Sequence, residues 1–146
     1  MRLVVSGWMA VVAATIVGCG GPAKVTMVPV KGYVKVATKP AVGALVVFHP
    51  LDAGKENAAK PVAVVAEDGT FVLTTTAKDD GAPAGEYAVT IVWHAKSKES
   101  NLPSLGDTSS NAGKDRLSGR YGNPKDSKLK QSIKKGEVYD LKFDLE

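Results

Sequence analysis

Apolar and polar residues alternate along several short segments of this 146-residue chain, and this alternation constrains its fold most strongly. In segment 30–36, three valines and a glycine share one side, and lysines and a tyrosine share the other. A period of two predicts a half-buried β-strand. Alternating or short β-rich segments of this kind are 30–36, 42–49, 62–66, 71–75, 84–94, 129–133 and 139–146.

Turn-forming residues separate these segments. Asp68-Gly69 lies between two β-rich runs, and Gly accepts the positive φ that a tight hairpin turn requires. Outside the first 18 residues, no segment shows a convincing helical period. About seven short strands with frequent turns are typical of a β-sandwich. The sequence therefore predicts one all-β domain over residues 28–146.

The first 18 residues have the pattern of a signal peptide. Arg2 supplies a positive charge, and an apolar run from Leu3 to Val17 follows it. This run is shorter than the roughly 20 residues of a membrane-spanning helix, but it matches a secretory h-region. Ile16-Val17-Gly18-Cys19 then resembles the bacterial lipobox. The resemblance implies cleavage after Gly18 and lipidation of Cys19, with palmitate-type acyl chains anchoring the protein in the bilayer.

Cys19 is the only cysteine, so it has no partner for an internal disulfide. Residues 19–27 are expected to form a short lipidated tether. Gly20, rather than aspartate, follows the cysteine, so by the proteobacterial sorting rule the outer membrane is open to this exported protein. The alternatives are an ordinary secretory signal with an incidental cysteine, or an uncleaved anchor helix.

The motifs along the domain resemble the carboxypeptidase-regulatory-like module. They are Val30-x-Gly32-x-Val34, Pro40 to Phe48, Glu67-Asp68-Gly69-Thr70-Phe71-x-Leu73 and Pro83-Ala84-Gly85-Glu86-Tyr87-x-Val89. The stretch from Asp115 to Pro124 is similar to one in small bacterial lipoproteins that carry this module. The resemblance implies a transthyretin-like β-sandwich and a non-catalytic structural or binding role in the cell envelope.

Common catalytic motifs are absent from the sequence, and we expect neither a cofactor nor an enzymatic activity. His49 and His94 each end a predicted strand. If they met at one end of the sandwich, they would form a weak metal site with a carboxylate such as Asp52. Surface imidazoles are the alternative. An envelope hydrolase, or a lipoprotein that binds a metal or a solute, is the alternative function.

Acidic residues near a predicted turn suggest a second, weaker cation site. Asp79 and Asp80, with Glu86 close in sequence, would offer oxygen ligands to calcium. A ring of alternating acidic ligands is missing there, so turn formation is the preferred interpretation.

The polar segment 95–126 is predicted to be a long basic loop. Between residues 96 and 136, ten basic residues face four acidic ones. This bias suits anionic lipid headgroups, an anionic polymer or an envelope protein, but a solvated loop that keeps the protein soluble is the preferred interpretation. The formal net charge of +4 is too small to predict nucleic-acid binding.

Arg116, Arg120 and Tyr121 are the candidate partner contacts within this loop. The alternative is that Leu117 and Tyr121 dock the loop on the sandwich while the arginines pair with Asp115 and other surface acids.

Overall fold

The computed structural model describes residues 25–52, 54–55, 58–94 and 113–146. These residues form strands and turns, and none of them is helical. The strands are β1 (Met27–Val28), β2 (Val30–Val36), β3 (Lys39–Pro40), β4 (Leu45–Pro50), β5 (Val62–Val64), β6 (Thr70–Val72), β7 (Ala82–Pro83), β8 (Gly85–Val92), β9 (Lys130–Ile133) and β10 (Tyr139–Leu145). The all-β class that the alternation predicted is confirmed.

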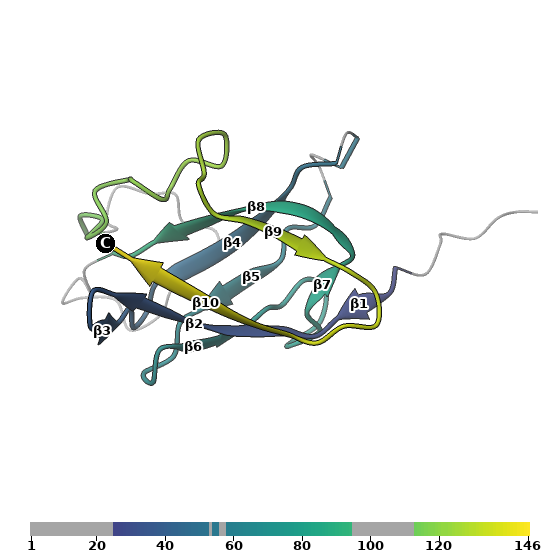
Figure 1. Ribbon diagram of the computed structural model, residues 1–146, viewed down its shortest axis with the longest axis horizontal. Coiled ribbons are helices and arrows are strands. Elements are labelled where there is room, and N and C mark those ends of the chain that lie inside the picture. Colours follow the sequence, from purple (N-terminus) through teal and green to yellow (C-terminus); the bar gives the residue numbers. More distant parts are fainter. Residues whose placement is uncertain (1–24, 53, 56–57, 95–112) are drawn as a thin grey trace, which may run out of the picture.

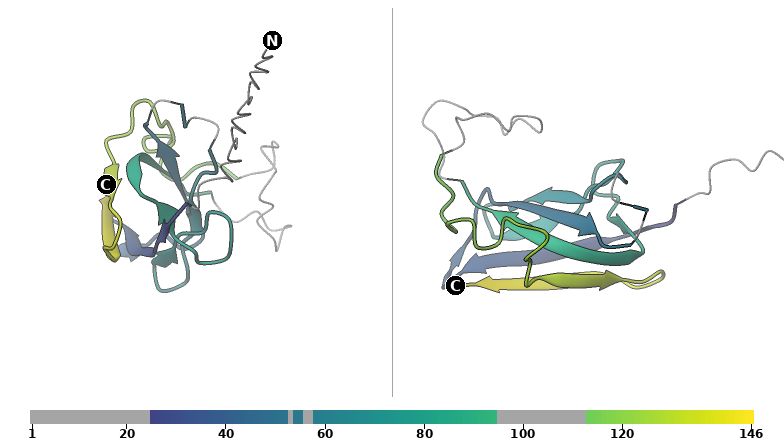
Figure 2. Two further views of the ribbon diagram at one scale, coloured as in Figure 1. Left: turned by 90° about the vertical axis from the view of Figure 1, so that its right-hand side faces the viewer. Right: turned by 90° about the horizontal axis from the view of Figure 1, so that it is seen from above.

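Two four-stranded sheets face each other across an apolar core (Figures 1 and 2). In the first, here the β2 sheet, β10 runs parallel to β2, and β3 and β6 pair antiparallel with different parts of β2. In the second, the β8 sheet, the order is β5-β4-β8-β9 and all neighbours are antiparallel. Strands β1 and β7 form a separate two-stranded ribbon. The architecture is sandwich-like.

The inner face of the β2 sheet follows the alternation in the sequence. Val30 and Val34 are buried, and the rings of Phe71 and Phe143 stack with their centroids 6.0 Å apart. Gly32 lies between these residues, where a Cβ atom would stand 2.4 Å from the carbonyl oxygen of Leu141. The parallel β2–β10 pair therefore depends on the missing side chain at residue 32.

The β8 sheet supplies the other half of the core. Phe48 of β4 and Tyr87 of β8 meet edge to face, with ring centroids 5.7 Å apart. The Tyr87 hydroxyl donates a 2.8 Å hydrogen bond to the carbonyl oxygen of Pro83, which ties the start of β8 to the residues before it. Burial, and to a lesser degree the carboxylate of Asp52, raise the pKa of Tyr87 to about 12.

The tight turn expected at Asp68-Gly69 is confirmed, but the strands on either side of it do not form a paired hairpin, because β5 pairs with β4 and β6 pairs with β2. Gly69 has a φ of 87°, and the Asp68 carboxylate accepts hydrogen bonds from the backbone amide and the hydroxyl of Thr70. These hydrogen bonds lower the pKa of Asp68. A short turn here lets β5 and β6 enter different sheets.

The described residues form ten strands where the sequence predicted about seven, because three pairs of residues form very short strands: β1, β3 and β7. In β3, Lys39 pairs with Val36 and Pro40 pairs with Lys35. Strand β4 begins at Leu45 rather than at residue 42, since Gly43 bends the chain with a φ of 79°.

Part of the predicted loop 95–126 is described. Residues 95–112 lie outside the described part of the chain, as do the predicted signal peptide 1–18 and Cys19. Residues 113–126 form consecutive turns beside the end of β8. Within the described ranges, no helix has the length and apolar character needed to cross a membrane.

Candidate functional site

The Asp115 carboxylate organises the chain at the end of β8. One of its oxygens accepts 3.0 Å hydrogen bonds from the backbone amides of Trp93 and Leu117, and the other accepts a 2.7 Å bond from Gly119. Burial acts to raise the pKa of Asp115, but these donors and the nearby His94 outweigh it and hold the pKa below its usual value. The ionised form of Asp115 thus fixes the turns that follow it.

Trp93 and Arg116 form the centre of the candidate site. The Trp93 indole N–H donates a 2.9 Å hydrogen bond to the carbonyl oxygen of Val42, which fixes the ring. The Arg116 guanidinium lies 4.8 Å from the ring centre, a cation–π distance. The Arg116 backbone amide also donates to the Trp93 carbonyl oxygen at 2.8 Å. Backbone and side chain together hold Arg116 against the indole.

A pocket of about 380 Å³ opens beside this pair. Among the described residues, its lining consists of Lys39, Pro40, Val42, Trp93, His94 and Arg116. Lys39 and Arg116 are basic, His94 carries an imidazole, and none of these described lining residues is acidic. Basic side chains beside an aromatic and apolar surface can bind an anionic group carried on a ring or chain with an apolar face. We call this the Trp93 pocket.

The other two predicted contact residues lie toward the C-terminal end of β10. The Arg120 guanidinium donates to the carbonyl oxygen of Glu146 and lies 6.0 Å from the Tyr121 ring centre. Leu117 is 1% exposed, and the half-buried Tyr121 packs against the core. Docking of this loop is therefore confirmed. The expected pairing of the arginines with Asp115 is wrong, because backbone amides occupy that carboxylate.

The two histidines do not converge. The β4–β8 register places His49 opposite Ala88, whereas His94 lies two residues beyond Val92, which pairs with Leu45 at the other end of β4. Antiparallel pairing therefore separates the imidazoles, and the expectation that they meet at one end is wrong. His49 is hydrogen-bonded to the Thr90 hydroxyl at 2.9 Å, and burial followed by the charge of Lys60 lowers its pKa.

Neither of the two predicted cation sites, around Asp52 and around Asp79 and Asp80, is formed by the described residues. In the described part of the chain, no group of three or more His, Cys, Asp or Glu residues is placed to hold a metal ion. Asp52 instead pairs with Lys55 at 2.8 Å. Asp80 accepts hydrogen bonds from the backbone amides of Thr75 and Ala77 at 2.6 and 2.8 Å.

The hydrogen bonds of Asp80 explain its acidity. Burial acts to raise the pKa of Asp80, but the Thr76 hydroxyl and three backbone amides lower it well below the usual value. Asp79 donates its amide to the Thr74 hydroxyl at 3.0 Å. Asp79 and Asp80 therefore stabilise a turn, which was the preferred interpretation of this acidic pair.

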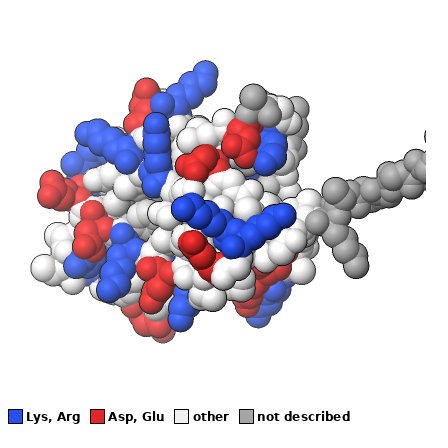
Figure 3. Space-filling model, turned by 45° about the vertical axis from the view of Figure 1, so that its right-hand side comes forward, with Lys and Arg blue, Asp and Glu red and all other residues white. Residues whose placement is uncertain are grey.

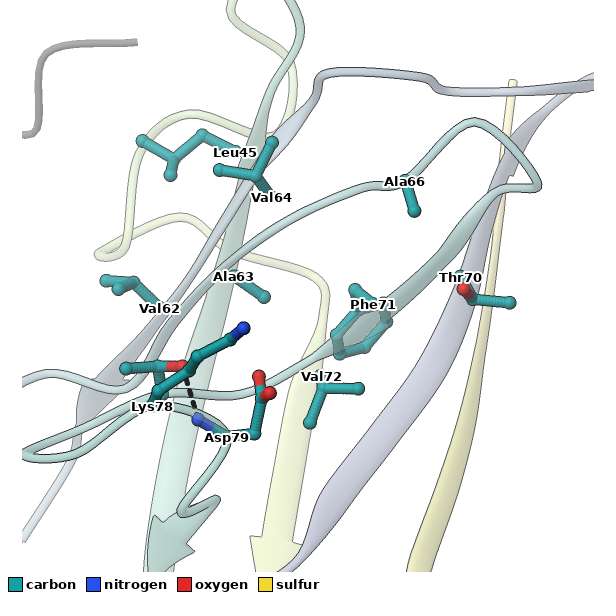
Figure 4. A pocket seen from close by; sticks show the side chains of 11 residues that line it. Leu45, Val62, Ala63, Val64, Ala66, Thr70, Phe71, Val72, Lys78 and Asp79 are labelled. Atoms are coloured by element: carbon teal, nitrogen blue, oxygen red, sulfur yellow. Dashed lines mark hydrogen bonds between the residues drawn. The ribbon is translucent and has the colours of Figure 1, made fainter. Parts of the chain in front are cut away.

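A second pocket, of about 360 Å³, lies between β5 and β6 (Figure 4). The two strands are joined at both ends, by the Val62–Thr74 bridge and by the Ala66–Thr70 hydrogen bond, and no strand pairing links them between those points. Its lining is mostly apolar, and its two charged residues, Lys78 and Asp79, have opposite signs. It therefore lacks the single sign of charge that distinguishes the Trp93 pocket.

Charge on the wider surface is mixed. On the face shown in Figure 3, basic and acidic side chains are interspersed, without a continuous area of either sign. This face therefore offers no extended area of one sign of charge for an anion.

No family model matches the chain, and neither does any curated protein or solved structure. The functional interpretation therefore rests on the described residues themselves.

The sequence analysis named two of the residues that line the Trp93 pocket, His94 and Arg116, but it missed Lys39 and Trp93. An aromatic residue at the end of a predicted strand, directly before a basic loop, was the available signal for Trp93.

Proposed function

We propose that the chain is a lipid-anchored, non-catalytic binding module of the bacterial cell envelope, and that its Trp93 pocket contacts an anionic envelope polymer. The observation that carries this proposal is the set of cations, Lys39 and Arg116, beside a fixed indole, with no acid among the lining residues that the structure describes. Binding through such a pocket requires only hydrogen-bond donors and an apolar surface, and both are present.

The anchoring part of the proposal rests on the sequence. The apolar run before Cys19 and the lipobox-like tetrapeptide support export and lipidation, and the tether 19–27 leads directly into β1 and β2. An anchor of two or three acyl chains would hold the domain stably at the membrane, outside the cytoplasm.

The proposed fold family is the transthyretin-like sandwich of carboxypeptidase-regulatory-like modules. Two four-stranded sheets, the Asp68-Gly69 turn and the glycine that begins β8 support this assignment. Members of that family serve mainly as structural or binding modules, which agrees with the proposed role.

The acidic residues support binding over hydrolysis. A hydrolase would use carboxyl groups with perturbed pKa values that face a cleft. The described carboxyl groups with lowered pKa values are Asp68, Asp80 and Asp115, and each accepts hydrogen bonds within a turn. Their perturbation has a structural cause.

Co-sedimentation tests the function. The full chain, reconstituted in neutral phosphatidylcholine liposomes, is mixed with polygalacturonate or with uncharged dextran. We expect polygalacturonate alone to bind, and we expect Lys39→Gln and Arg116→Gln to weaken that binding. Lys125→Gln removes an exposed cation outside the pocket and should leave binding unchanged. Equal binding of both polymers, or equal loss in all three variants, would contradict the proposal.

A further inference from the structure

Strand β10 has one free edge. All seven of its residues pair with β2 on one side. Among the described residues no strand pairs with its other side, so β10 ends the β2 sheet (Figure 1). A long, unpaired edge strand is the commonest place for another chain to add to a sheet.

The backbone hydrogen bonds show which residues face that free edge. The Tyr139 amide donates to the carbonyl oxygen of Pro29 at 3.4 Å, and the carbonyl oxygen of Leu145 accepts from Ala37 at 2.9 Å. In a parallel pair, every second residue directs both backbone groups to the same neighbour. The odd-numbered residues of β10 therefore bond to β2. Asp140, Lys142 and Asp144 direct their N–H and C=O groups outward.

The side chains of these three residues are exposed on the outer face of the β2 sheet and alternate in charge. Asp144 forms a 3.2 Å ion pair with Lys35 of β2. Asp140 lies in register with Lys31 and Lys142 with Tyr33, and neither makes an ion pair within the described part of the chain. One acid and one base on the free edge are thus available to a partner.

The C-terminal end of this edge is already occupied. The Glu146 amide donates to the Tyr121 hydroxyl at 3.5 Å, and its carbonyl oxygen accepts from Arg120. A new strand can therefore pair with β10 only before residue 146.

We propose that a second copy of this chain pairs antiparallel with β10 around a twofold axis at Leu141. In this register Asp140 lies opposite the partner's Lys142, and Lys142 lies opposite the partner's Asp140. All four residues direct their backbone groups to the edge, so the pairs also exchange main-chain hydrogen bonds. The β2 sheets of the two copies join into one continuous sheet, and the interface is self-complementary, as twofold symmetry requires.

The neighbouring registers are excluded by charge and by the occupied end. An axis at Lys142 places that lysine opposite its own copy and Asp140 opposite the partner's Asp144, which are like-charge pairs. An axis at Phe143 places Asp140 opposite the partner's Glu146, which is acidic and whose backbone groups are occupied. The axis at Phe143 would also place Lys142 opposite the partner's Asp144, but Asp144 already forms an ion pair with Lys35. The axis at Leu141 is the register that forms two ion pairs from the charges left unpaired in the described part of the chain.

Sedimentation equilibrium of the full chain in density-matched detergent tests the dimer. We expect Asp140→Lys and Lys142→Asp each to raise the dimer dissociation constant by about tenfold or more, because each creates two like-charge pairs across the axis. The double swap Asp140→Lys/Lys142→Asp should restore association, since it re-forms both pairs with the signs exchanged.

Asp144→Lys is the matched control. Residue 144 faces the partner's Val138 in the proposed register, so its charge reversal should leave the dissociation constant unchanged. A chain that sediments as a monomer at every concentration, or single swaps that the double swap does not rescue, would overturn the proposal. Weakening by Asp144→Lys equal to that by Lys142→Asp would overturn the register, because it places the axis at Phe143.

Discussion

The Arg116 guanidinium lies 4.8 Å from the centre of the Trp93 indole, and both residues are held by backbone hydrogen bonds that do not depend on any ligand. The pocket beside them is therefore preorganised, and binding there does not require the arginine to be ordered first.

Asp115→Asn should destabilise the domain. The substitution keeps the shape of the side chain but weakens three hydrogen bonds to backbone amides. We expect a loss of about 1–2 kcal/mol in the free energy of unfolding, measured by urea denaturation. Asp126→Asn is the control, since Asp126 bonds only the exposed Asn123 side chain.

The decline in the free energy of unfolding at acid pH should also depend on Asp115. Its folded pKa lies below the ordinary value of 3.8, so the ionised form stabilises the fold above that value. As the pH falls through and below 3.8, the unfolded chain takes up a proton first and stability declines. Urea midpoints measured across this range should fall less steeply in Asp115→Asn than in the unsubstituted chain. Parallel curves would contradict the assigned role.

Ionisation of Tyr87 should lower the free energy of unfolding at alkaline pH. Its pKa is raised to about 12 in the folded chain from the ordinary value of 10.0, so stability is complete below pH 10 and declines as the pH rises toward 12. The hydrogen bond to Glu137 also raises the pKa of Tyr139, so the step that belongs to Tyr87 is identified by comparing tyrosinate absorbance in the unsubstituted chain and in Tyr87→Phe. Tyr87→Phe removes that step and the bond to Pro83, at a cost of about 1 kcal/mol.

Gly32→Ala tests the close approach of β2 and β10. The added Cβ atom would lie 2.4 Å from a backbone oxygen and 2.7 Å from the Phe71 ring, so the strands must separate. We expect a loss of roughly 3 kcal/mol in thermal or urea unfolding. Gly122→Ala places its Cβ atom no closer than 3.6 Å to any neighbour and should change stability by much less.

Local pattern was enough to predict the strands but not how they meet. Alternation located the strands that became β8 and β10, and Asp68-Gly69 located a tight turn, because each depends on neighbouring residues. The separation of His49 from His94 depends on the β4–β8 register, which joins residues about forty positions apart.

The candidate site was only half predicted for the same reason. The Trp93 pocket joins Lys39 of β3 to Arg116 of a late turn, and β3 itself exists only because two residues meet the end of β2. The role of Asp115 was likewise hidden, since its three amide donors become neighbours only when the turns close. Sequence composition indicated a basic segment but not which of its residues gather around an aromatic ring.

Fluorescence of Trp93 tests the central claim most directly. The chain has two tryptophans, Trp8 in the predicted signal peptide and Trp93 in the pocket. Cleavage after Gly18 would leave Trp93 as the one indole, and Trp8→Phe gives the same result in a chain that is not processed. We expect polygalacturonate to change the emission of this variant saturably, dextran to leave it unchanged, and Arg116→Gln to remove most of the response. An emission that polygalacturonate does not alter, although the polymer binds the chain, would contradict the account.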